Sequence, residues 1–184
     1  MLSESTPGRR VEKNKLRLGV SSCLLGNEVR YDGGHKLDRI VTDESGALFE
    51  WVPVCPEVEA GLGTPRPPMH LTLSNGAVRM VEIVSGRDRT KAVSRWADRR
   101  ISELAMLDLS GFVLKKDSPS CGWIGVRVDG DEWLPKREAR GLFAETLARA
   151  FPQLPVEDEG RLEDPRLRKD FIERVFAYRR LCDS

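Results

Sequence analysis

The sequence lacks an excess of charge of one sign and lacks any long apolar run. Lysine and arginine number 30 and aspartate and glutamate 29 in a chain of 184 residues. Such a balance argues against a strong overall attraction to nucleic acid or membrane, so any attraction has to come from a local patch. No stretch approaches the roughly 20 apolar residues that span a bilayer, and residues 1–15 lack the apolar middle of a secretory signal. We expect a flexible leader over residues 1–15 and a cytoplasmic protein with neither a membrane nor an obligate protein partner.

Cysteine and histidine are scarce, with four and two residues. Four cysteines are too few for a disulfide scaffold in a chain this long, and in a reducing compartment unpaired cysteines are core residues, ligands or catalysts. Because 31 residues separate Cys23 from Cys55 and 65 separate Cys55 from Cys121, there is no CxxC pair. This spacing argues against a zinc ribbon and a thioredoxin-like dithiol. Cys182 lies two residues from the C-terminus, and we expect no role for it.

Alternating apolar strands and amphipathic helices predict an α/β domain with a mainly parallel, Rossmann-like central sheet, flanking helices and one or two β-hairpin excursions. Helical spacing of apolar residues predicts a helix over 90–107, and turn signals predict hairpins around 75–76 and 129–130. The other expected elements are strands at 16–21, 51–54, 111–114 and within 154–162, and helices at 37–49, 137–150 and 165–181. The domain is predicted to span 16–164, with a C-terminal helix over 165–184.

Three cysteines come shortly after the last apolar residue of a predicted strand. The pairs are Val20 and Cys23, Val54 and Cys55, and Leu114 and Cys121. Ligands of open parallel sheets bind outside the carboxyl ends of the strands. If the three strands are parallel neighbours, the three sulfur atoms converge on one edge of the sheet.

The residues alone leave several roles open for these thiols. Packing in the core is one, although each cysteine has Ser, Pro or Gly beside it. Three thiolates favour a soft or borderline metal, and structural zinc would need a fourth ligand, for which His35 and His70 are the candidates. An iron–sulfur cube on three cysteines would leave one iron open to substrate. A metal-free cysteine hydrolase would need a histidine base, which two loop histidines supply poorly.

Polar residues beside the cysteines are candidates for proton transfer. The segment DSPSCG contains Ser118 and Ser120, and CPEVEAG contains Glu57 and Glu59. A carboxylate near a metal centre acts as a general acid or base when burial tunes its pKa. Glu57 could instead cap a helix that starts after Pro56, and Glu59 is expected at the surface.

Three segments, VSSCLLGNEVRYDGGHK, PVCPEVEAGLGTPRPP and LKKDSPSCG, resemble the TudS-like thiouracil desulfidases, a small bacterial family formerly known as a domain of unknown function. The resemblance runs from about residue 16 to 151. Farther on, GRLEDPRLRKDFIERVFAYRRL is similar to the junction in longer, two-domain relatives that are associated with removing sulfur from 4-thiouridine in tRNA. The chain thus resembles the N-terminal domain of those relatives, and 165–184 resembles the junction to an absent second domain.

The resemblance implies an iron–sulfur enzyme. It implies a [4Fe–4S] cluster on Cys23, Cys55 and Cys121, with the fourth iron open to the sulfur of a thiolated uracil, free, as a nucleotide or within tRNA. It also implies non-redox hydrolysis of C=S to C=O with release of hydrosulfide, and a catalytic carboxylate and hydroxyl, which we assign to Glu57 and Ser118. The alternative function is a zinc-bound structural or RNA-binding module that uses the same cysteines.

Further residues are secondary candidates. Glu50, five residues before Cys55, is a rival for the carboxylate. Asp32 and Lys36 are weaker candidates for holding substrate or the loop.

One helix face is rich in cations. Lys91, Arg95 and Arg99 recur at four-residue spacing, which suits either a stripe that contacts phosphates or a solvated face paired with nearby acids.

Overall fold

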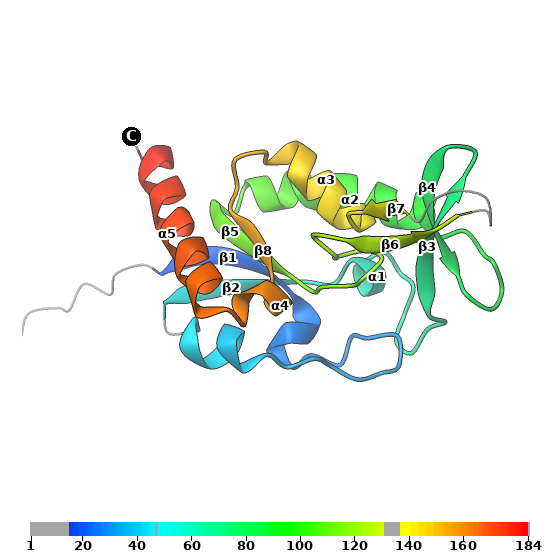
Figure 1. The fold of residues 1–184 in the computed structure, drawn as a ribbon, viewed down its shortest axis with the longest axis horizontal. Helices are drawn as coiled ribbons and strands as arrows, with labels where there is room; N and C mark the ends of the chain where they lie inside the picture. The colour runs from blue at the N-terminus through cyan, green and yellow to red at the C-terminus, as the bar shows by residue number, and fades with distance from the viewer. Residues whose placement is uncertain (1–14, 47, 131–136, 184) are drawn as a thin grey trace, which may run out of the picture.

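The computed structural model describes residues 15–46, 48–130 and 137–183, and within them one sheet is parallel (Figure 1). Its strands are β1 (Leu16–Ser21), β2 (Phe49–Val54), β5 (Leu109–Leu114) and β8 (Val156–Asp158), in the order β2-β1-β5-β8. Every pairing in this sheet is parallel, which confirms the prediction. Because helices cover both faces, the central strands are mostly apolar, and all six residues of β5 are buried.

At one position of this sheet, an aromatic ring packs directly against the backbone of a glycine. Gly19 of β1 pairs with Phe112 of β5, and the Phe112 ring lies over it, so that a Cβ on Gly19 would stand 2.1 Å from the ring. A side chain at this position would overlap the core of the molecule.

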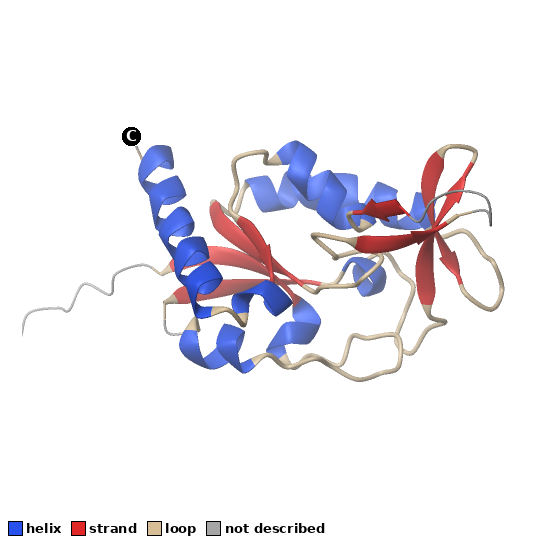
Figure 2. Cartoon of the chain, in the orientation of Figure 1, coloured by secondary structure: helices blue, strands red, loops and turns tan. Residues whose placement is uncertain are grey.

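The two predicted hairpins join into a second sheet, which the sequence did not predict. It consists of β4 (Ala77–Glu82), β3 (Met69–Ser74), β6 (Val126–Asp129) and β7 (Arg137–Ala139), in the order β4-β3-β6-β7. Asn75 and Gly76 both have positive φ in the tight turn between β3 and β4, as a two-residue hairpin requires. β6 pairs antiparallel with β7, but the connection is longer than a two-residue turn at 129–130 and runs through 131–136, outside the described residues. Figure 2 shows the two sheets as separate groups of strands.

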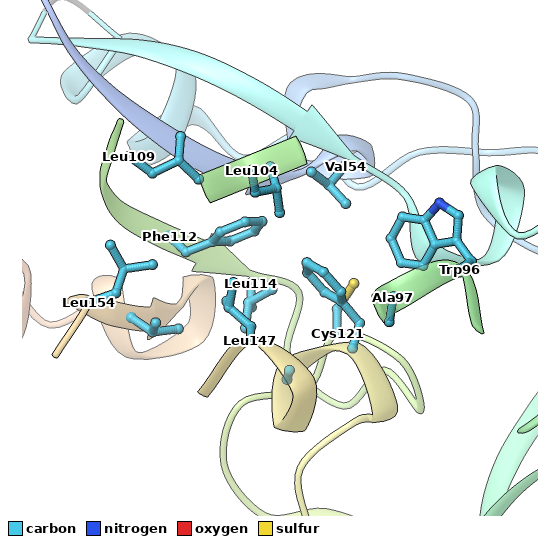
Figure 3. Close-up of a cluster of buried hydrophobic side chains, with 13 residues drawn as sticks. Val54, Trp96, Ala97, Leu104, Leu109, Phe112, Leu114, Cys121, Leu147 and Leu154 are labelled. Atoms are coloured by element: carbon cyan, nitrogen blue, oxygen red, sulfur yellow. The ribbon is translucent and has the colours of Figure 1, made fainter. Parts of the chain in front are cut away.

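Helices α2 (Thr90–Ala105) and α3 (Leu142–Ala150) cover one face of the parallel sheet (Figure 1). The Phe143 ring of α3 lies 5.4 Å from Trp96 and 5.7 Å from Phe112, centroid to centroid. This apolar cluster includes Cys121 (Figure 3). One thiol of the predicted site therefore borders the main core.

A second set of helices covers the opposite face. It comprises the 3₁₀ turn η1 (Ser22–Leu25), the π-helix η2 (Ile40–Glu44), α4 (Glu159–Leu162) and α5 (Pro165–Cys182). Phe171 and Val175 of α5 are buried beneath these elements together with Cys23. The predicted C-terminal helix therefore exists and packs on the same sheet as the rest of the chain.

Two predicted helices were wrong in their extent. Residues 137–150 begin with the strand β7, because Arg137–Ala139 pair with β6, and the helix starts only at Leu142 after extended Gly141. Residues 37–49 contain only η2, since β2 already begins at Phe49. The predicted leader, residue 15 excepted, lies outside the described residues. None of the described helices is both long and apolar enough to cross a membrane.

Candidate active site

Three cysteines from three separate strand ends line one cavity, as the sequence predicted. Cys23 lies in η1 after β1, Cys55 directly precedes α1 (Pro56–Glu59), and Cys121 lies in the loop after β5. The parallel register brings these ends to the same edge of the sheet, around a cavity of about 560 Å³. All three are free thiols.

The thiols are buried close to one another. Cys23 and Cys121 are 9% and 5% exposed. The pKa of Cys23 is raised to about 11, mainly by burial and also by the neighbouring Cys55, while Lys115 and Arg30 act in the opposite direction. Burial also raises the pKa of Cys121 well above its ordinary value, a hydrogen bond from Ser21 opposes this rise, and the other two cysteines add to it. Cys55 therefore raises the pKa of both of these thiols.

Cys55 adjoins the start of α1. Burial raises its pKa, and the backbone N–H groups of Val58 and Glu57 lower it by hydrogen bonding to the sulfur. The first N–H groups of a helix have no partner within the helix, so they are available to a sulfur atom at this position. The Cys55 thiol also donates to the Val29 carbonyl over 3.7 Å.

Glu57 is buried in the wall of the cavity, where it is 8% exposed. Arg66 donates to its Oε2 from Nε at 2.7 Å and from Nη2. Ser120 Oγ donates to Oε1 at 2.6 Å. Glu57 lies in the first turn of α1, as the capping interpretation expected, but its oxygens bind Arg66 and Ser120, and Glu59 is the residue that accepts the N–H of Cys55, at 2.8 Å. Glu57 is thus a fully bonded carboxylate that faces the thiols.

Ser118 lies next to this carboxylate. Its Oγ is 3.1 Å from Ser120 Oγ and accepts the backbone N–H of Cys121 at 3.1 Å. The two hydroxyls connect Ser118 through Ser120 to Glu57. A chain of this kind can move a proton between the carboxylate and the cavity.

Two of the three secondary candidates lie outside the cavity. Glu50 sits at the start of β2, at the opposite edge of the sheet, where its 55% exposed side chain pairs with Arg17 at 3.2 Å. It does not line the cavity, which sets it aside as the carboxylate. Asp32 also lies outside the lining and binds the Gly34 N–H at 3.0 Å within its own loop, whereas Lys36 lines the cavity.

Neither histidine joins the cysteines. His35 accepts the N–H of Leu37 at 3.1 Å, and His70 pairs with Asp129 at 2.5 Å. In the described ranges, no three His, Cys, Asp or Glu side chains lie close enough together to hold a single metal ion. The histidine-completed zinc site is therefore not assembled.

The donor set fits a polynuclear cofactor better than a single ion. The three sulfurs surround a space rather than a point, and soft thiols of this kind hold iron–sulfur clusters. Lys115 and Arg30 lie near enough to favour the thiolate form of Cys23, which a cluster requires. The residues present thus fit a cluster.

Sequence reasoning missed several residues of the site. Arg66 stands in the segment PRPP, which indicated only an ordered loop. Glu159 binds Lys115 Nζ and accepts the backbone N–H of Lys116 at 2.7 Å, so it positions two residues that line the cavity. With Arg30, Lys36 and Arg66, these two lysines place five cations in the lining. The double lysine of LKKDSPSCG was the available signal for them.

The cationic stripe lies outside the cavity. Lys91, Arg95 and Arg99 are exposed on α2, and none has an ion-pair partner within the described part of the chain. The paired-face alternative is therefore not what the structure shows.

Comparison with known proteins agrees with this geometry. The model of the 2-thiouracil desulfurase family matches residues 18–159. The uncharacterized protein YbbK of Bacillus subtilis (strain 168) is 36% identical over 149 residues, which are 76% of this chain and 95% of YbbK. The solved structure of the [4Fe–4S]-dependent thiouracil desulfidase TudS is 32% identical with a TM-score of 0.66, and the match covers 85% of this chain and 97% of TudS. The chain therefore belongs to the 2-thiouracil desulfurase family.

Proposed function

We propose that this protein removes sulfur from a thiolated uracil compound by hydrolysis, using a [4Fe–4S] cluster held by Cys23, Cys55 and Cys121. The family and the fold support desulfidase chemistry on thiouracil. The observation that carries the proposal is the convergence of three free thiols, from three strand ends, on one cavity. With only three protein ligands, a bound cluster supplies an open iron, a Lewis acid for the soft sulfur of a C=S group.

The reaction exchanges sulfur for oxygen without a change in oxidation state. Water adds to the ring carbon, the C=S bond breaks, and sulfur leaves as hydrosulfide. Of the two protons of water, one ends on the departing sulfur and the other is taken up by a base. Glu57 lines the cavity as a carboxylate and is the base that we assign to accept the proton of water. Ser118 is the hydroxyl that orients the reacting group, and Ser120 connects it to Glu57.

The cavity suits a substrate with an anionic part. Its volume of about 560 Å³ lies in the range of small-molecule sites. Among the described residues, Lys36 and Lys116 have no ion-pair partner for their ammonium groups, although both line the cavity. We therefore favour a phosphate-bearing form, a 4-thiouridine nucleotide or thiolated tRNA, over the free base. The α2 stripe is suited to further phosphates of an RNA, and the free thiols suit a reducing, cytoplasmic location.

The test is anaerobic reconstitution followed by metal analysis and assay of hydrosulfide release from 4-thiouracil, its nucleotide and thiolated tRNA. We expect about four irons per chain and sulfide release from at least one substrate. Single Cys→Ser variants at 23, 55 and 121 should lose iron, whereas Cys182→Ser, at the exposed C-terminal end of α5, should not. Four bound irons without sulfide release from any substrate would disprove the reaction, and zinc without iron would favour the zinc-bound module.

A further inference from the structure

The side chain of Arg66 joins the three segments that carry the cysteines. Arg66 lies in the loop between α1 and β3, and its side chain is only 5% exposed. A buried arginine needs partners for its five N–H groups, since an unpaired buried charge is costly. The partners of Arg66 come from different segments of the chain, so its side chain holds these segments together.

Two of the partners belong to the segment of Cys55. Nε and Nη2 bind Oε2 of Glu57, two residues after the cysteine, and Nη1 binds the Gly63 carbonyl at 2.9 Å. The guanidinium therefore anchors α1 to the loop that follows it.

A further partner belongs to the segment after Cys23. Nη1 of Arg66 donates to the Val29 carbonyl at 3.0 Å, and its backbone N–H donates to the Tyr31 carbonyl at 2.9 Å. The same Val29 carbonyl accepts the Cys55 thiol. Arg66 thus ties the first cysteine segment to the second.

Arg66 is connected to the segment of Cys121 through the carboxylate of Glu57. Glu57 uses Oε2 for Arg66 and Oε1 for Ser120, the residue before Cys121. With Arg66 on one oxygen and Ser120 on the other, Glu57 has one orientation available. The Glu57 charge would repel three thiolates if it stood alone, and the guanidinium offsets it.

We propose that Arg66 is a positioning residue that sets the three cysteine segments at their mutual spacing before any cofactor binds. The inference relies on the proposed function only for taking the cysteines as a ligand set. Arginine is required because a planar guanidinium can bind a carboxylate with two N–H groups and still donate to two carbonyls. Lysine keeps the charge but offers a single nitrogen, so it cannot make these contacts together.

The chain contains a matched control. Arg89 also binds a buried carboxylate with two nitrogens, since its Nε and Nη2 lie 2.6 and 2.5 Å from Oε1 of Glu82. Glu82 ends β4 of the second sheet and Arg89 precedes α2, and among the described residues neither forms a hydrogen bond or ion pair with a cysteine segment. Arg89→Lys therefore replaces a two-nitrogen contact of the same kind by a single ammonium group without touching the site.

The experiment measures thiol alkylation of the metal-free protein, resolved by mass spectrometry for each cysteine, well below the melting temperature. In Arg66→Lys we expect Cys23, Cys55 and Cys121 to react about tenfold faster or more, because local opening is no longer opposed by charge-assisted hydrogen bonds. In Arg89→Lys their rates should stay within about twofold of the unmodified protein. Cys182, which is exposed, serves as the internal reference.

Iron content after anaerobic reconstitution is the second measurement. It should fall in Arg66→Lys and be unchanged in Arg89→Lys. If Arg66→Lys does not fold, the double variant Arg66→Gln with Glu57→Gln replaces it, since it leaves no unpaired buried charge. Equal alkylation rates and equal iron in the two lysine variants would overturn the proposal, as would equal acceleration in both. If the unmodified protein takes up no iron, the proposed function fails, and the alkylation rates still decide the role of Arg66.

Discussion

At the scale of single residues, the site depends on a carboxylate that is buried and yet fully bonded. Glu57 has a cationic partner on one oxygen and a hydroxyl donor on the other, so it has no freedom to rotate. A base that is held in one orientation loses little entropy when it reacts. The same carboxylate lines the cavity with Ser118 and the cysteines, which makes it the residue whose removal tests the chemistry most directly.

We expect Glu57→Gln to lower the rate of sulfide release by about a hundredfold or more, since glutamine keeps the shape but is not a base. Rates are to be normalised to bound iron, so that a loss of cofactor is counted separately. Glu50→Gln is the control, because Glu50 lies exposed at the other edge of the sheet, and it should leave the rate unchanged. A rate for Glu57→Gln equal to that of the control would remove Glu57 from the reaction.

At the scale of elements, β1 and β5 set the position of two of the three cysteines. Their contact depends on Gly19, over which the Phe112 ring lies. The packing of these two strands therefore requires a residue without a side chain at position 19.

Gly19→Ala should destabilise the protein by about 1–3 kcal/mol, because the added methyl group overlaps the ring. For a chain of this size the melting temperature should fall by several degrees. Adding Phe112→Leu should recover part of the loss, and calorimetry on the three proteins measures both effects. An unchanged melting temperature in the single variant would contradict the packing described.

The link between β4 and α2 predicts a dependence of stability on pH. Hydrogen bonds from Ser85 and Arg89 lower the pKa of Glu82 below its ordinary value of 4.5. A lowered pKa in the folded state means that the ionised carboxylate stabilises the protein above about pH 4.5 and that this contribution is lost as the pH falls through the folded pKa. The difference in melting temperature between the unmodified protein and Glu82→Gln should therefore be constant near neutral pH and shrink below pH 4.5. A constant difference down to pH 3 would contradict it.

The elements also show where sequence patterns succeed and fail. The apolar runs of β1, β2 and β5 identify buried parallel strands, and the strand ends locate the cysteines. The pairing of β3 with β6, which creates the second sheet, joins residues more than 50 positions apart and has no local pattern. For the same reason Arg66 could not be identified: its partner Val29 lies 37 positions away in the sequence, and its neighbours indicate only a loop.

At the scale of the whole molecule, a nearly neutral chain surrounds a locally basic cavity. The formal net charge is +1, yet the lining contains five cations. Three of them, Arg30, Arg66 and Lys115, have acidic partners in Asp32, Glu57 and Glu159. The other two, Lys36 and Lys116, are the cations to which the proposed function assigns the phosphate of the substrate.

Lys36→Gln and Lys116→Gln should each raise KM for a thiouridine nucleotide by about three- to tenfold and leave KM for the free base unchanged, because only the nucleotide carries phosphate. The KM increase should be largest at low salt, where screening is weakest. Lys169→Gln is the control, since Lys169 is exposed on α5 and pairs with Glu173. Equal increases for both substrates would show that the lysines act on the base or on the fold.

Cys121 belongs to the apolar cluster beneath α2 and α3, while Cys23 belongs to the cluster beneath α4 and α5. Whatever the three sulfurs hold is consequently fastened to the layers on both sides of the sheet. If an oxidant removes the proposed cofactor, the link between these two layers is lost. Amide hydrogen exchange should then become faster in the apolar clusters on both sides of the sheet.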